Sequence, residues 1–168
     1  MRNDYLKKLM LTTIFLALCV VGANVKILGS IALDSAPAFL GAILLGPAIG
    51  AFLGFFGHLL SAMLAGFPLT LPVHLIIGVM MAACMFVFGL LRQRLTLSRG
   101  LVIVISDAIG YLINVPLELT LLYPILKQSV VALLLPLTIA TILNLILCEL
   151  VSAALPKRVR RTFKALKH

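Results

Sequence analysis

Polar side chains that could bond a small molecule are spread along a chain that is otherwise strongly apolar. Asn114 and Glu118 are four residues apart, and Thr141 and Asn144 are three apart, so each pair shares one face of a helix. Amide, hydroxyl, imidazole and carboxylate groups together suit hydrogen bonding to a small polar or mixed ligand. The candidate substrate-binding residues are Asp34, His58, Ser61, Phe67, His74, Asn114, Glu118, Thr138, Thr141 and Asn144, with Phe67 as an aromatic wall.

The same polar groups have a simpler use, as hydrogen bonds between helices with no ligand. An ionisable group inside a bilayer is costly and usually faces a cavity or a partner, so for the set as a whole we favour a ligand pocket. His58, His74 and Glu118 lack the spacing of metal ligands, and we predict neither a metal nor a cofactor. The sequence contains no GxxxxGK[ST], HExxH or GxSxG motif, so we predict neither a Walker A nucleotide site nor enzymatic activity.

The composition of the chain indicates that most of it lies in a lipid bilayer. Hydrophobic residues make up 62% of the 168-residue chain and charged residues 11%, against about 45–50% and 25% in soluble domains. The net charge of +9 comes from basic residues at the termini and in short breaks between apolar runs, which is typical of membrane orientation. We therefore predict a multi-pass protein of the bacterial cytoplasmic (inner) membrane that does not bind nucleic acid.

Four apolar runs have the length of a membrane span, at about 6–23, 72–91, 101–122 and 129–155. The run at about 36–66 is too long for one straight span, and Gly46-Pro47 interrupts its middle. Either one long tilted helix crosses here, or a short helix of about 36–45 precedes a second helix of about 47–65.

The basic residues decide between these alternatives. With six spans and both termini cytoplasmic, residues 1–8, 92–99 and 156–168 carry twelve basic residues on the inner side, and only Lys26 and Lys127 lie outside. Five spans would place the loop 92–99 and the tail opposite the basic N-terminus, against the positive-inside rule. The sequence predicts an all-α membrane protein of six transmembrane helices with a short second helix, as one domain over 1–155 followed by a basic cytoplasmic tail over 156–168.

This orientation places the candidate binding residues in the outer half of the membrane. Asp107 and Glu149 fall in the inner half, where we expect ion pairs with basic residues of the loop 92–99 or the tail. Gly46, Gly50 and Gly54 have the four-residue spacing that lets another helix approach closely. The first helix has small residues four apart at Thr13, Ala17, Cys19 and Ala23, and we expect these to dock a partner subunit.

The stretch LGAILLGPAIGA at residues 40–51, continuing to Gly54 and His58-Leu59-Leu60, resembles a known family. It is similar to the substrate-binding S components of energy-coupling factor (ECF) vitamin transporters, and the resemblance covers most of the chain. It implies a subunit that captures a vitamin from outside with high affinity. It further implies partners in a transmembrane coupling subunit and two cytoplasmic ATPases. Many members carry an acid where this chain has His58, and the first helix lacks a clean Ala-x-x-x-Ala pair.

The substrate is the open question of this interpretation. The stretch from His58 through Pro72 to His74 most resembles the type proposed to take up α-ribazole, a nucleoside precursor of cobalamin. That resemblance implies that Phe67 stacks on the base while Asn114, Glu118 and Thr141 bond ribose hydroxyls. Another vitamin such as pantothenate or riboflavin remains an alternative. Two further hypotheses are a small intramembrane enzyme using His58 and Glu118 as an acid–base pair, and an assembly factor with no ligand.

Overall fold

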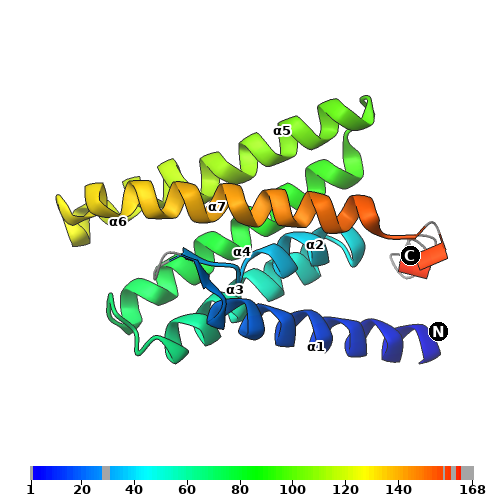
Figure 1. The fold of residues 1–168 in the computed structure, drawn as a ribbon, viewed down its shortest axis with the longest axis horizontal. Helices are drawn as coiled ribbons and strands as arrows, with labels where there is room; N and C mark the ends of the chain where they lie inside the picture. The colour runs from blue at the N-terminus through cyan, green and yellow to red at the C-terminus, as the bar shows by residue number, and fades with distance from the viewer. Residues whose placement is uncertain (1, 28–30, 157, 160–161, 164–168) are drawn as a thin grey trace.

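The computed structural model describes residues 2–27, 31–156, 158–159 and 162–163, and most of these are helical. Figure 1 shows the elements in chain order. They are α1 (Arg2–Asn24), β1 (Lys26–Ile27), β2 (Ile31–Ala32), α2 (Ala36–Leu44), α3 (Pro47–Leu64), α4 (Leu71–Arg94), α5 (Arg99–Leu112), the π-helix η1 (Ile113–Leu117), α6 (Glu118–Leu126) and α7 (Ser129–Ala154). The four runs predicted as single helices correspond to α1, α4, the continuous α5–η1–α6 and α7. The predicted tail, residues 156–168, falls largely outside the described residues.

The apolar run at about 36–66 divides into two helices at Gly46-Pro47, as this helix-breaking pair predicted. Gly46 has a φ of 110°, which residues with a Cβ rarely adopt, and Pro47 is the first residue of α3. The alternative of one long tilted helix is therefore wrong. With nine residues and about 1.5 Å of rise each, α2 is too short to cross a bilayer alone.

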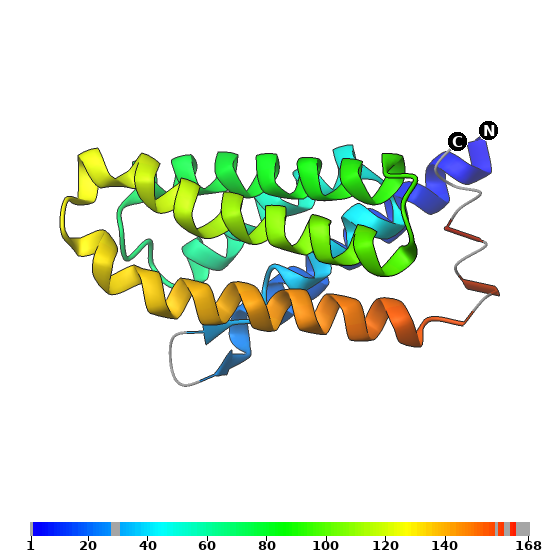
Figure 2. The same cartoon turned by 90° about the horizontal axis from the view of Figure 1, so that it is seen from above.

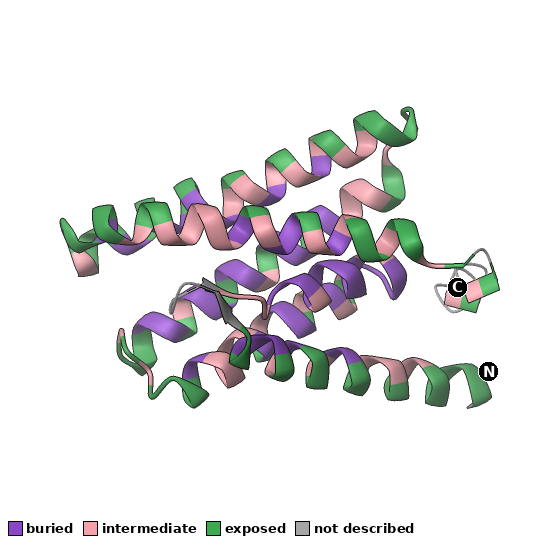
Figure 3. Cartoon of the chain, viewed as in Figure 1, coloured by how far each residue is buried: buried purple, intermediate pink, exposed green. Residues whose placement is uncertain are grey.

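Five helices of the described chain are long and apolar enough to span a membrane: Asn3–Asn24, Pro47–Leu64, Leu71–Arg94, Arg99–Leu126 and Ser129–Ala154. The sixth predicted span is α2, whose side chains are mostly buried; Phe39 and Ala42 are fully enclosed. Large apolar side chains are exposed on the outer faces of the long helices. Val79 and Leu135, for example, are 59% and 67% exposed. Figure 3 shows this pattern, with buried residues concentrated on α2 and on the faces of α3 and α4 that meet it.

The connections between the helices lie at two opposite ends of the bundle. The N-terminus, the Gly46-Pro47 turn, the α4–α5 connection and the C-terminal part of the chain lie at one end in Figures 1 and 2. The α3–α4 and α6–α7 connections lie at the opposite end. The charge pattern predicted the same grouping of connections, and its assignment of the two ends to the inner and outer sides stays a prediction.

Small residues on α3 let neighbouring helices approach closely. A Cβ added at Gly50 would lie 2.4 Å from the Cβ of Ala42 in α2, and one at Gly54 would lie 2.8 Å from the carbonyl oxygen of Met81 in α4. The predicted glycine stripe thus packs inside the bundle. Phe39 and Phe88 close the core with their rings edge to face, 4.9 Å between centroids.

A short antiparallel hairpin joins α1 to α2, where the sequence suggested only a connecting segment. Lys26 pairs with Ala32 and Ile27 with Ile31. The Leu33 amide donates to the Gly22 carbonyl over 3.1 Å, and a Cβ at Gly22 would collide with that backbone. The hairpin is thereby tied to the end of α1, which brings Asp34 against the bundle.

Candidate functional site

A cavity of about 280 Å³ lies between the end of α1, the hairpin, α3 and the start of α4. Its volume is close to the lower end of the range for small-molecule sites. Four of the predicted residues line it, Asp34, His58, Ser61 and His74, and the rest of the wall is mostly alanine, leucine and proline. Asn24 also lines it and was missed by the sequence analysis. Its signal was a polar side chain at the outward end of the first helix.

Two imidazoles form the polar edge of this cavity. His58 Nε2 lies 3.1 Å from His74 Nδ1, and the Leu69 amide donates to His74 Nε2 over 3.4 Å. Because Nε2 of His74 accepts, a neutral His74 carries its proton on Nδ1 and donates it to His58. This orders the pair and leaves Nδ1 of His58 as the remaining donor.

The loop between α3 and α4 holds Phe67 beside this pair. The Phe67 ring centroid is 5.8 Å from that of His74. Phe67 and Thr70 have φ of 51° and 73°, values that residues other than glycine rarely adopt. Strained backbone of this kind persists where the surrounding structure demands it and concentrates at ligand clamps and active sites.

The carboxyl group of Asp34 is held by α3. Ser61 hydrogen-bonds to Asp34, one turn along the helix from His58. Burial raises the pKa of Asp34, and the hydrogen bonds from Ser61 and from the Asp34 and Ser35 amides oppose that rise. The site therefore combines a carboxyl group, a hydroxyl and two imidazoles around one small space.

The predicted residues of α7 make hydrogen bonds to other parts of the protein. Asn144 accepts the Ala36 amide over 2.7 Å and donates to the Ala32 carbonyl over 3.0 Å, so it joins α7 to the hairpin and to the first turn of α2. Thr138 lies 3.3 Å from the Tyr111 hydroxyl. Asn144 and Thr138 therefore form hydrogen bonds between elements of the protein, which is the alternative to ligand binding given by the sequence analysis.

Asn114, Glu118 and Thr141 form a separate buried group. The Asn114 amide donates to Thr141 over 2.8 Å. Asn114 Oδ1 and Glu118 Oε2 are buried and have no hydrogen-bond partner among the described residues. The structure thus divides the predicted site into the cavity of Asp34, His58, Ser61 and His74, and a deeper polar group on η1, α6 and α7.

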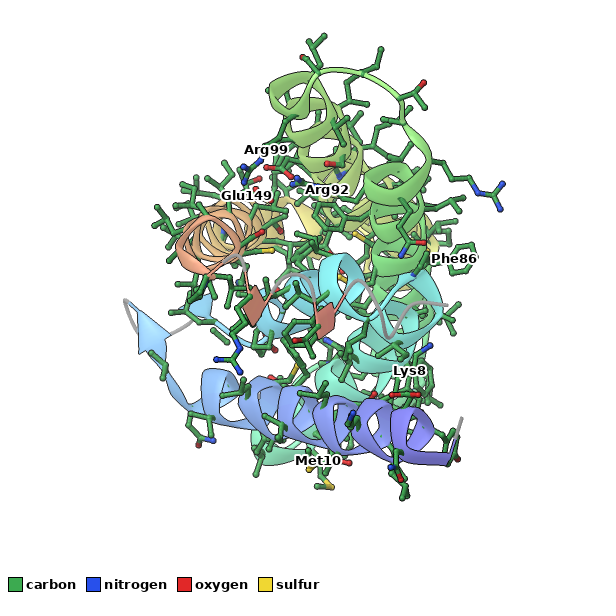
Figure 4. The ribbon with its side chains drawn as sticks, turned by 90° about the vertical axis from the view of Figure 1, so that its right-hand side faces the viewer. Lys8, Met10, Phe86, Arg92, Arg99 and Glu149 are labelled. Atoms are coloured by element: carbon green, nitrogen blue, oxygen red, sulfur yellow. The ribbon has the colours of Figure 1, made fainter. Side chains whose placement is uncertain are left out.

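The expected ion pairs at the other end of the bundle are confirmed. Arg92 of α4 donates through one guanidinium nitrogen to Asp107 of α5 over 2.7 Å and to Glu149 of α7. Figure 4 shows Arg92 and Glu149 converging between their helices while Phe86 points away from the bundle. The guanidinium also lies 5.0 Å from the Phe88 ring centroid.

The predicted docking residues of α1 lie on two different faces. Thr13 and Ala17 are exposed. Cys19 is fully buried, and a Cβ at Gly57 would lie 3.1 Å from the Cys19 Cβ, so Cys19 packs against α3. Ala23 is 5% exposed and lines the cavity, so neither of these two lies on the open face of α1. Cys19, Cys84 and Cys148 are free and buried. Within the described part of the chain, no group of three or more His, Cys, Asp or Glu side chains is placed to hold a metal.

Comparison with known proteins identifies a matching family. The model of the family described as ECF-type riboflavin transporter, S component, matches residues 3–161. Neither the curated proteins nor the solved structures include a significant match.

Proposed function

The chain belongs to the ECF-type riboflavin transporter S component family, and from this premise we propose that its cavity binds a vitamin with a planar aromatic ring and a hydroxylated side chain. The family comprises membrane subunits that bind a vitamin for uptake and act with an ECF module of a coupling subunit and ATPases; they are not enzymes. The observation that carries the proposal is the cavity in which Asp34, Ser61, His58 and His74 meet.

The cavity opens, in this proposal, toward the outside of a bacterial cytoplasmic membrane. The termini and the α4–α5 connection carry most of the basic residues and lie at the end opposite the α3–α4 loop. The positive-inside rule then makes that end cytoplasmic. A vitamin would enter beside Phe67 and His74, and the ATPases would act at the basic end.

Riboflavin is the first candidate substrate because the family match is to the riboflavin type. The rings of Phe67 and the two histidines provide aromatic surface for a flat heterocycle, and Asp34 and Ser61 supply hydrogen bonds at its edge. The second candidate is α-ribazole, which the stretch from His58 to His74 favours and which also joins a dimethylated aromatic ring to a hydroxylated five-carbon unit. Pantothenate has no aromatic ring and serves as the comparator.

The exposed face of α1 is the proposed contact with the coupling subunit. Thr13 and Ala17 are small, four residues apart and outward-facing, so a helix of a partner can approach the α1 backbone closely there. This proposal keeps two of the four residues that the sequence suggested and leaves Cys19 and Ala23 to packing inside the bundle.

The test is direct ligand binding by the purified chain in nanodiscs. Riboflavin is titrated by quenching of its fluorescence, and α-ribazole and pantothenate by calorimetry. We expect a submicromolar Kd for one of the two aromatic ligands and no binding of pantothenate. If no ligand of the panel binds more tightly than micromolar, the assignment of this cavity as a vitamin site is wrong.

A further inference from the structure

One side chain of α7 holds both ends of the short segment that carries the carboxyl group of the cavity. Asn144 accepts the Ala36 amide through Oδ1 over 2.7 Å and donates through Nδ2 to the Ala32 carbonyl over 3.0 Å. Asp34, which lines the cavity, lies midway between these two residues in the chain. Figures 1 and 2 show the β1–β2 hairpin beside α7, in agreement with these bonds. We call residues 32–36 the Asp34 segment.

Both amide hydrogens of Asn144 are used inside the protein. The side chain is 1% exposed, and its nitrogen also donates to the Ala140 carbonyl within α7 over 2.8 Å. Because a backbone amide donates and a carbonyl accepts, these partners fix which end of the side chain carries the oxygen. Asn144 is not among the residues that line the cavity. Its influence on a ligand would therefore pass through the Asp34 segment.

The N-terminus of α2 depends on the same side chain. The first amides of a helix lack partners within that helix and need an acceptor from elsewhere. Ser35, the N-cap of α2, makes no side-chain capping bond, and Pro37 has no amide proton. The buried Ala36 amide takes its acceptor from Asn144, 108 residues away in sequence. Because a buried amide without an acceptor is costly, this bond fixes where the chain leaves Asp34 and enters α2.

The Asp34 segment is also held by α1. The Leu33 amide donates to the Gly22 carbonyl over 3.1 Å. A Cβ added at Gly22 would collide with the Leu33 carbonyl and lie 3.1 Å from the Asp34 Cα, so the absence of a side chain lets the segment approach α1 this closely. The backbone around Asp34 is therefore fixed by α1 and α7 together, and Ser61 of α3 bonds to the carboxyl group that results from this placement.

We propose that Asn144 is a positioning residue for ligand binding, which acts through Asp34 and does not touch the ligand. This inference rests on the proposed function, and it gives Asn144 a different role from the direct ligand contact that the sequence analysis expected. The role requires a short side chain that accepts and donates at once, and asparagine meets that requirement. With leucine at this position the segment would keep its bond to Gly22 and lose both bonds to α7.

The test is a double-mutant cycle on riboflavin binding, measured by fluorescence quenching with the full chain in nanodiscs. Asp34→Ala removes the carboxyl group, Asn144→Leu removes both bonds to the segment, and a third protein carries both changes. We expect each single variant to weaken binding on the order of tenfold, because each loses the same buried hydrogen bond to the ligand. The double variant should bind no more weakly than Asp34→Ala, since the two changes act on one contact.

Gly22→Ala displaces the same segment from the side of α1, which keeps the cycle informative if Asn144→Leu does not fold. It should weaken riboflavin binding in the wild-type background and add no further loss to Asp34→Ala. Two matched controls should bind as the wild type does. Gln128→Leu removes an exposed amide at the start of α7, and Gly100→Ala adds a Cβ that meets no described atom within 4 Å.

Losses that multiply in the double variants would mean that Asn144 and Gly22 only stabilise the fold, and would overturn the proposal. Wild-type affinity in Asp34→Ala or in Asn144→Leu would overturn it as well.

Riboflavin binding by the wild type reports separately on the proposed function, and if it is absent the cycle is repeated with α-ribazole by calorimetry. If neither ligand binds, the proposed function fails, and hydrogen exchange of the ligand-free protein decides whether Asn144 holds the Asp34 segment. Faster exchange across residues 33–36 in Asn144→Leu than in Gln128→Leu would support that role, and equal exchange would overturn it.

Discussion

The two ends of the bundle treat their polar groups differently. At the basic end, Asp107 and Glu149 share the guanidinium of Arg92, so three helices are joined by ions that neutralise one another in part. Toward the opposite end, Asp34, His58, Ser61 and His74 line a cavity, and Asn114 Oδ1 and Glu118 Oε2 have no protein donor among the described residues. Polar groups that pair with one another stabilise the packing of the helices. The polar groups that line the cavity are the ones open to a ligand.

Removing the shared cation should produce the largest effect on stability. Arg92→Met leaves two carboxylates, 25% and 22% exposed, without their partner, and breaking such a pair from one side costs about 3 kcal/mol. Thermal unfolding in detergent should show a clear drop in Tm, and Arg94→Met on the exposed face should not. Equal Tm values for the two variants would show that the cluster is not a structural joint.

A change in the cavity should affect binding more than folding. His74→Ala removes the donor to His58 and the ring beside Phe67, and we expect vitamin binding on the order of tenfold weaker. Val79→Ala on the lipid-facing side of the same helix is the control. If both variants bind as the wild type does, the cavity is not the ring-binding site, and the distinction between the two ends fails.

The outer face of α1 should affect transport without affecting binding. Thr13→Leu and Ala17→Leu place bulk where we propose that a helix of the coupling subunit packs. Uptake by cells that contain the complete transporter should fall several-fold while the isolated chain binds its vitamin normally. Ala132→Leu, exposed on α7, adds the same bulk elsewhere and should leave uptake unchanged.

The smallest effect concerns pH. The folded state raises the pKa of Asp34, so the native protein holds this proton more tightly than the unfolded chain does. Stability should therefore fall as pH rises from about 4, the unperturbed value, through the raised folded pKa. Asp34→Asn should flatten this part of the Tm–pH profile. Ser61→Ala removes the hydrogen bond that opposes the shift and should extend the decline to higher pH; an unaltered profile in both variants would contradict this.

Much of the fold could be predicted because it depends on local properties. Apolar length gave the long helices, and the Gly46-Pro47 pair gave the division between α2 and α3. The number of crossings was harder to predict, because α2 has only nine residues and lies buried among its neighbours. The hairpin between α1 and α2 was not predicted, since its strands are two residues each and are stabilised by contacts with Gly22 and Asn144.

The candidate site could be predicted as a set of residues but not as a geometry. Spacing on a helix placed Asn114 and Glu118 on one face, and Thr141 and Asn144 on one face of another helix. Spacing could not show that the Asn144 side chain accepts a hydrogen bond from the Ala36 amide, 108 residues away in sequence, or that Asn114 donates to Thr141. Hydrogen bonds between distant segments depend on how helices pack, and no periodicity in the sequence records them.

The sequence by itself determined that this is a membrane protein, which apolar runs form its long helices, that the run of about 36–66 divides at Gly46-Pro47, and that Asp107 and Glu149 pair with a cation. Hydropathy, proline, glycine and charge act over a few residues, so they can be read without a fold. Only the tertiary structure decided which polar groups satisfy one another and which are left over. That difference follows from burial, since a hydrogen bond inside a membrane bundle has no water to replace it. Among the described residues, Asn114 Oδ1 and Glu118 Oε2 are buried atoms that are left without a partner.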